Sequence, residues 1–177
     1  MDGEKFLHAM QEKVAYESLQ PKFLGYQNEV DELQDLRIFS AKLDLSRFAT
    51  EKKEKFKEEL DKATRELEEV LSSNHKTWGT ARTAINSFLQ MALYNRYLSE
   101  SFDLYLAEHL FELPLVKRTV DGLRRYEKNN YLPEWSGLDL LKPDVANQYQ
   151  DFARKMADNL GVSRIHLSMF LWPGWNT

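Results

Sequence analysis

The chain of 177 residues contains no cysteine, only five prolines and only seven glycines. Without cysteine, disulfides, thiol nucleophiles, iron–sulfur clusters and cysteine-ligated zinc are all excluded. The chain also lacks an apolar run of roughly 18 residues, which a membrane-spanning helix needs. Its first residues, Met1 to Lys5, lack the basic and then apolar order of a signal peptide. We therefore expect a cytoplasmic protein with no membrane partner.

Several motifs that carry chemistry are missing as well. The sequence has no Gly-rich phosphate loop and no Gly-x-Ser-x-Gly elbow. Its four histidines are scattered, and none is spaced as His-x-x-His or His-Glu-x-x-His. The sequence therefore predicts no metal site, no cofactor and no catalytic residue.

A strong excess of positive charge is also absent, because the net charge is −4. Residues 1–72 carry 12 basic against 17 acidic residues, whereas residues 73–177 carry 12 against 11. Within the second part, residues 117–128 hold five basic side chains against two acidic ones. This local excess is typical either of a solvated helix face or of a phosphate-binding surface.

What is present is helical periodicity. Apolar residues at 81, 84, 85, 88, 89 and 92 follow the spacing of one helical face, and Met91, Leu93 and Tyr94 widen that face. A helix that is apolar on more than one side belongs in a core. Alternation with a period of two is missing throughout, so the sequence predicts an all-α fold, a compact multi-helix domain organised around residues 81–94.

The polar segment 72–74 suggests two subdomains: an acidic helical hairpin or three-helix layer over 1–72, and a helical core over 73–177. We expect Thr50 to cap a helix over 51–71, Pro114 to begin another helix, and Gly161 to end a third. Residues 102–111 are predicted to form an apolar helix. Ser163 is predicted to cap a last helix over 165–172.

Three short segments within residues 78–172 stand out: GTARTAIN at 79–86, LPLVKRTV at 113–120 and SRIHLSMFLW at 163–172. Together they resemble the helix-hairpin-helix DNA glycosylase superfamily. The first is similar to that family's Gly-Val-Gly-Arg-Lys-Thr-Ala-Asn turn, the second to its Pro-Val-Asp-x-x-Val helix start, and the third to its closing apolar helix. In that family the turn's N–H groups and the following helix N-terminus hold a DNA phosphate. The resemblance implies a DNA partner for this chain.

The catalytic positions of that family are not retained. Thr83 stands where the bifunctional enzymes have lysine, and Val116 stands where the family has its aspartate. Valine cannot stabilise a cationic sugar or activate a nucleophile, so the resemblance implies that base excision has been lost.

Our leading hypothesis is a non-catalytic, DNA-associated helical protein. Its predicted nucleic-acid-binding residues are Gly79, Thr80, Arg82, Thr83, Lys117, Arg118, Arg124, Arg125 and Lys128. Tyr126 and Tyr131 flank the basic run, where they either stack on unpaired bases or supply core area.

Two alternatives remain open. One is a protein–protein interaction module or homodimer that associates through residues 50–72, where Phe56, Leu60 and Leu67 form a narrow apolar stripe. The other is an enzyme whose site is assembled from Glu108, Glu112, His109 or His166.

Overall fold

The computed structural model describes residues 3–24, 30–71, 76–128 and 131–171. Within these ranges every regular element is a helix, so the predicted all-α fold is confirmed. Short 3-10 helices, labelled η, are interspersed among the α-helices. The elements in chain order are α1 (Gly3–Ser18), α2 (Pro21–Leu24), α3 (Val30–Lys42), η1 (Leu45–Phe48), α4 (Lys53–Val70), α5 (Trp78–Tyr94), α6 (Arg96–Ser101), η2 (Leu104–Leu110), α7 (Lys117–Tyr126), η3 (Leu138–Leu140), α8 (Pro143–Leu160), η4 (Arg164–His166) and α9 (Leu167–Phe170).

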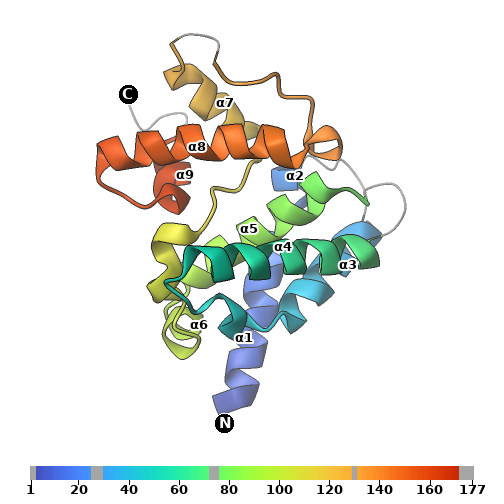
Figure 1. Cartoon of the computed structure of the whole chain (residues 1–177). Helices are drawn as coiled ribbons and strands as arrows, with labels where there is room; N and C mark the ends of the chain where they lie inside the picture. Colours follow the sequence, from blue (N-terminus) through green and yellow to red (C-terminus); the bar gives the residue numbers. More distant parts are fainter. Residues whose placement is uncertain (1–2, 25–29, 72–75, 129–130, 172–177) are drawn as a thin grey trace.

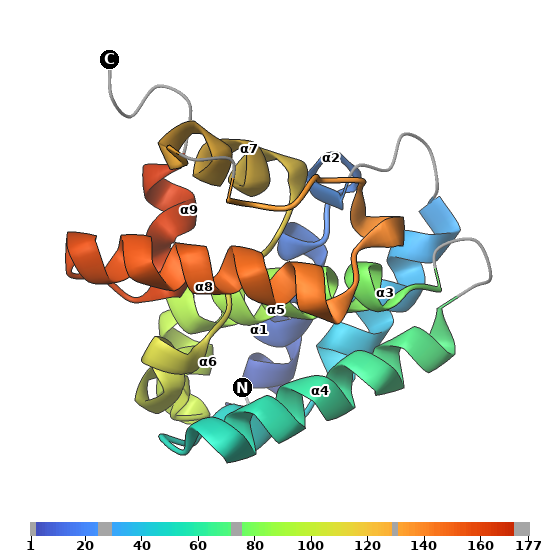
Figure 2. The same cartoon turned by 45° about the horizontal axis from the view of Figure 1, so that its top comes forward.

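Helix α5 lies at the centre of the molecule, as its sequence predicted. Residues 81–89 are all buried, and only Met91 and Tyr94 expose large side chains near its end. Helices α1, α3 and α4 contact α5, and η3 covers its beginning. In Figures 1 and 2 α5 runs between α4 on one side and α8 on the other. The broad apolar surface of α5 is explained by these neighbours.

The apolar core divides into two clusters of buried side chains. The first runs from Val14 to Phe111 and also takes in Ile165, and the second runs from Leu113 to Leu171. We call residues 3–112 the N-terminal lobe and residues 113–171 the C-terminal lobe. Figure 1 shows α7, α8 and α9 of the C-terminal lobe gathered at one end of the molecule.

The predicted division into 1–72 and 73–177 does not coincide with this division of the core. Its boundary segment, 72–74, lies outside the described residues. On either side of it, α4 and α5 pack together within the first cluster. The stripe of α4 is buried in that contact, because Phe56, Leu60 and Leu67 are at most 3% exposed.

Some predicted helix ends are correct and others are wrong. Gly161 ends α8 in the left-handed conformation, with φ of 67°, as expected. Lys52 rather than Thr50 is the N-cap of α4, and the Thr50 hydroxyl accepts the Lys52 N–H. Pro114 lies ahead of α7, which begins at Lys117.

Thr119 explains this later start of α7. Its Oγ1 accepts the N–H of Val116 at 3.0 Å and donates to the carbonyl of Pro114 at 2.6 Å. These bonds hold residues 114–116 in a turn before the helix, with Val116 as the N-cap.

Two predicted helices are interrupted. The expected helix over 102–111 is replaced by the 3-10 helix η2, because Asp103 adopts a left-handed conformation with φ of 51° after α6. The expected last helix splits into η4 and α9, with Ser163 as the N-cap of η4, and Trp172 lies outside the described residues.

Among the described helices, none combines the length and apolarity needed to traverse a bilayer.

Candidate nucleic-acid interface

The predicted phosphate-binding turn at Gly79 is already helix in the structure. Helix α5 begins at Trp78, and the Thr77 hydroxyl caps it by accepting the N–H of Thr80 at 3.2 Å. The expectation of a glycine turn at this position is therefore wrong. Thr77 is a favourable N-cap, so the helix starts before the residues that would have formed the turn.

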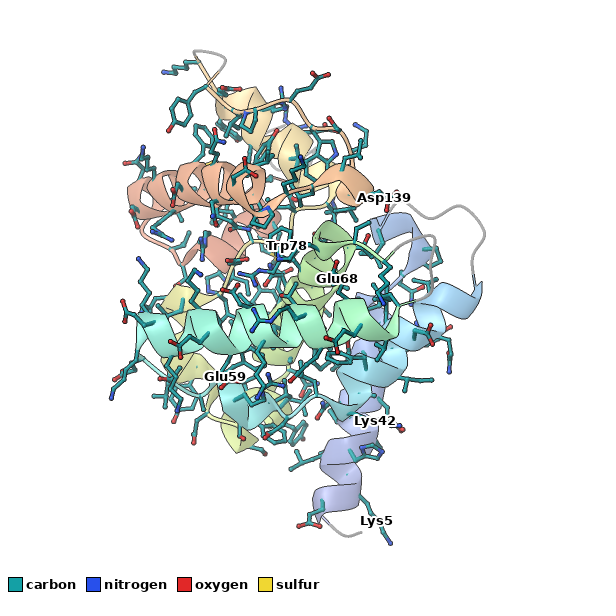
Figure 3. All side chains as sticks on the ribbon, turned by 45° about the vertical axis from the view of Figure 1, so that its right-hand side comes forward. Lys5, Lys42, Glu59, Glu68, Trp78 and Asp139 are labelled. Carbon is teal, nitrogen blue, oxygen red and sulfur yellow. The ribbon has the colours of Figure 1, made fainter. Side chains whose placement is uncertain are left out.

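Gly79 has a packing role instead. A Cβ atom built at this position would lie 2.2 Å from the carbonyl oxygen of Leu138 and 2.7 Å from the Cβ of Leu141. Only glycine allows η3 to approach the first turn of α5 so closely. Figure 3 labels Trp78 of α5 and Asp139 of η3, one residue from each of the two elements that meet here. The neighbouring Thr80 and Thr83 are at most 1% exposed, so they offer no surface to a phosphate.

The charge of Arg82 is neutralised within the molecule. Its Nη1 donates to Asp61 at 2.8 Å, and its Nε and Nη2 donate to the two carboxylate oxygens of Glu112 at 2.9 and 3.0 Å. The Trp78 ring lies 5.5 Å from the guanidinium carbon. Burial acts to lower the pKa of Arg82, but the Glu112 and Asp61 carboxylates outweigh it and raise that pKa. Arg82 therefore joins α4, α5 and the segment after η2 rather than facing a ligand.

Two arginines of the basic run on α7 also make internal contacts. Arg124 donates through Nε to the hydroxyl of Tyr149 at 3.2 Å and through Nη2 to the carbonyl of Pro133. Arg125 remains exposed but donates to the carbonyl of Leu171 at 2.8 Å. Arg124 is thus part of the packing of the C-terminal lobe, whereas Arg125 still reaches the surface.

The remaining basic residues lie on the outer side of α7. Lys117 is 78% exposed and pairs with Asp121 at 2.6 Å, Arg118 is partly exposed, and Lys128 is exposed just after the helix. Helical spacing places Arg118 and Arg125 on the side opposite the buried Val120 and Leu123, and Lys117 at the edge of that side. We call Lys117, Arg118, Arg125 and Lys128 the α7 basic face.

Tertiary structure adds a residue that sequence reasoning did not name. The ammonium of Lys155, on α8, lies 5.8 Å from the ring centre of Tyr131. Tyr131 is 61% exposed, so the pair lies at the surface. No local signal links two residues on different elements, which is why the sequence could not reveal this contact.

Val116, which stands where the resembled family has its aspartate, is the N-cap of α7 and is 8% exposed. Valine carries no group that could act as an acid, a base or a nucleophile at this position.

The residues of the enzyme alternative separate into different environments. Glu108 and His166 meet at 2.9 Å, and Ser163 and Tyr94 extend this cluster by hydrogen bonds to Glu108 (3.0 Å) and to the His166 Nδ1 (2.9 Å). The hydrogen bond from His166, aided by Ser163, lowers the pKa of Glu108 despite its partial burial.

This cluster borders a hollow of about 490 Å³, which Asp158 also lines. The other two candidates lie elsewhere, because Glu112 is bound to Arg82 and His109 is exposed. Among the described residues no group of three or more ligands is arranged to hold a metal ion.

Comparison of the chain with protein-family models, with curated proteins and with solved structures gave no match.

Proposed function

We propose that the protein binds nucleic acid without catalysing a reaction on it, through phosphate contacts with the α7 basic face. The observation that carries this proposal is the separation of charge between the lobes. Residues 1–112 hold 15 basic against 21 acidic residues, whereas residues 113–171 hold nine against seven. The outer side of α7 concentrates that positive charge, with Asp121 as its acidic member.

The proposal differs from the sequence-based hypothesis in the residues that it uses. Gly79, Thr80, Arg82 and Thr83 are buried, and Arg124 holds the segment around Pro133. Lysine and arginine side chains at the surface bind phosphates by displacing condensed counterions, and this requires exposed charge. Lys117, Arg125 and Lys128 meet that requirement, and Arg118 beside them is partly exposed.

Self-association through residues 50–72 receives less support. The apolar stripe that would have formed the interface is covered by the chain's own α5. A partner would have to displace α5 to reach Phe56 or Leu60. No contact among the described residues favours the replacement of α5 by a partner.

The test is retention of the purified protein on heparin and on immobilised DNA at low salt. The variant Lys117→Glu/Arg118→Glu/Lys128→Glu should lose retention. In the unaltered protein log K should fall linearly with log salt, with a slope of about −0.7 to −0.9 per phosphate contact. A protein that passes through both columns at low salt would contradict the proposal.

The matched control is Lys5→Glu/Lys53→Glu/Lys55→Glu, which reverses the same number of exposed charges on the N-terminal lobe. It makes the same change in net charge, so it should retain the binding that the α7 variant loses. Equal loss in both variants would mean that net charge rather than the α7 basic face governs retention.

A further inference from the structure

Two exposed tyrosines lie at the same end of α7 as Arg125 and Lys128. Tyr126 is the last residue of the helix and is 42% exposed, and Tyr131 is 61% exposed. Glu127 follows Tyr126 in the chain, and Leu132 follows Tyr131. The carboxylate of Glu127 accepts a hydrogen bond from the N–H of Leu132. This bond brings both tyrosines to the C-terminal end of α7.

The segment that carries Tyr131 is anchored on its C-terminal side. The carbonyl of Pro133, two residues away, accepts hydrogen bonds from Arg124 and from the hydroxyl of Tyr149, the latter at 2.6 Å. Trp135 packs edge-on against the Tyr149 ring, with centroids 6.0 Å apart. A ring held on an anchored segment loses little conformational entropy when a ligand stacks on it.

Positive charge accompanies these rings. Lys155 places its ammonium near the face of Tyr131, and Lys128 lies in the segment between the two tyrosines. Glu127, which is partly exposed, also lies between the tyrosines, where its carboxylate accepts the N–H of Leu132, and the next acidic residue is Glu134, beyond Pro133. Surfaces that bind single strands combine aromatic rings, on which the bases stack, with positively charged groups that contact the phosphates.

We infer that the ligand of the α7 basic face is unpaired nucleic acid, whose bases stack on Tyr126 and Tyr131 while its phosphates contact Arg125, Lys128 and Lys155. The inference rests on the proposed function and specifies its substrate class. In a duplex the base faces are covered by neighbouring pairs, so surface tyrosines can stack only on bases that are unpaired.

The other exposed tyrosines of the described chain all lie on the acidic N-terminal lobe, and they are Tyr16, Tyr94, Tyr97 and Tyr105. The hydroxyl of Tyr105 donates to Asp103 at 3.2 Å. Tyr105, which is 53% exposed, therefore serves as a matched control.

The experiment is fluorescence anisotropy at low salt with a labelled single strand of mixed sequence and with the duplex of the same sequence. The double variant Tyr126→Ala/Tyr131→Ala should bind the single strand at least roughly five-fold more weakly, because stacking is worth about 1–3 kcal/mol per base. Its duplex binding should be unchanged. Tyr126→Phe/Tyr131→Phe, which keeps both rings, should restore single-strand affinity, and Tyr105→Ala should leave it unaltered.

The outcomes separate this inference from the proposed function. Equal affinity for both nucleic acids, with no effect of the double alanine variant, overturns the inference and leaves the proposed function standing. Binding of neither nucleic acid overturns both. A loss of single-strand affinity that the phenylalanine variant does not restore also overturns the inference, because stacking needs only the ring.

Discussion

The pair formed by Arg82 and Glu112 joins two charged side chains that are only 7% and 15% exposed. Removing both ions from water is costly, so such a pair persists only when the remaining donors and acceptors are satisfied. Here Asn86 donates to the Glu112 carboxylate at 2.9 Å, and Thr64 and Asp61 accept from Arg82. This network explains why the arginine of the glycosylase-like string is unsuited to phosphate binding.

The Glu112→Gln variant should be less stable by about 3 kcal/mol at neutral pH, because it leaves part of the buried Arg82 charge uncompensated. Burial raises the pKa of Glu112, but Arg82 lowers it further and leaves it below its ordinary value. A depressed pKa stabilises the fold above the unfolded glutamate pKa of about 4.3, and this stabilisation disappears as pH falls through the folded pKa.

The stability difference between Glu112→Gln and the unaltered protein should therefore shrink below about pH 4. Urea unfolding of both proteins at a series of pH values measures this difference. A difference that stays constant down to acid pH would mean that Glu112 is not an ionised partner of Arg82.

At the scale of elements, the contact between α5 and η3 depends on the absence of one side chain. Glycine within a helix usually costs about 1 kcal/mol relative to alanine, so helix propensity alone predicts that Gly79→Ala stabilises the protein. The backbone of Leu138 opposes this gain, because it occupies the space that a Cβ would need. Packing and helix propensity therefore predict changes in stability of opposite sign for Gly79→Ala.

We expect the steric clash with η3 to outweigh the gain in helix propensity, so Gly79→Ala should lower stability by about 1–3 kcal/mol. Thermal and urea denaturation measure the change. Gly3→Ala in α1 is the control, since nothing lies within 4 Å of its added Cβ. It should be neutral or slightly stabilising, and a stabilised Gly79→Ala would show that η3 yields to the methyl group.

The elements also show which helix positions and helix ends the apolar periodicity of the sequence could predict. The centre of α5 and the end of α8 at Gly161 followed from local rules, because both depend on residues within one or two helical turns. The start of α7 was missed because Thr119 binds back to Pro114, and the break after α6 was missed because Asp103 is left-handed. Neither feature alters the apolar pattern.

At the scale of the whole molecule, the two lobes are joined by the segment after α8. Ile165 is fully buried in the N-terminal cluster, although it lies in the C-terminal lobe. Beside it, Arg164 donates to the carbonyls of Phe111 and Leu110 at 3.2 and 3.1 Å. Burial lowers the pKa of Arg164 to about 10. The hydrogen bond between Glu108 and His166, at 2.9 Å, adds a third connection.

Ile165→Ala should therefore destabilise both lobes together, by about 2–5 kcal/mol. Far-UV circular dichroism follows all helices, whereas tryptophan fluorescence includes the signals of Trp78 and Trp135, which both pack against the second cluster. The two signals should give one coincident transition in the unaltered protein. Separate transitions would contradict coupling of the lobes through this segment.

The sequence by itself determined the helical class, the central position of residues 81–94 and the absence of cysteine chemistry, because periodicity and composition are local properties of the chain. Only the tertiary structure decided which charges reach water. Arg82 and Lys117 look alike in sequence, yet one pairs with Asp61 and Glu112 in the interior and the other is exposed on α7. The surroundings of a charge depend on segments that are distant in the chain, and folding alone brings those segments together.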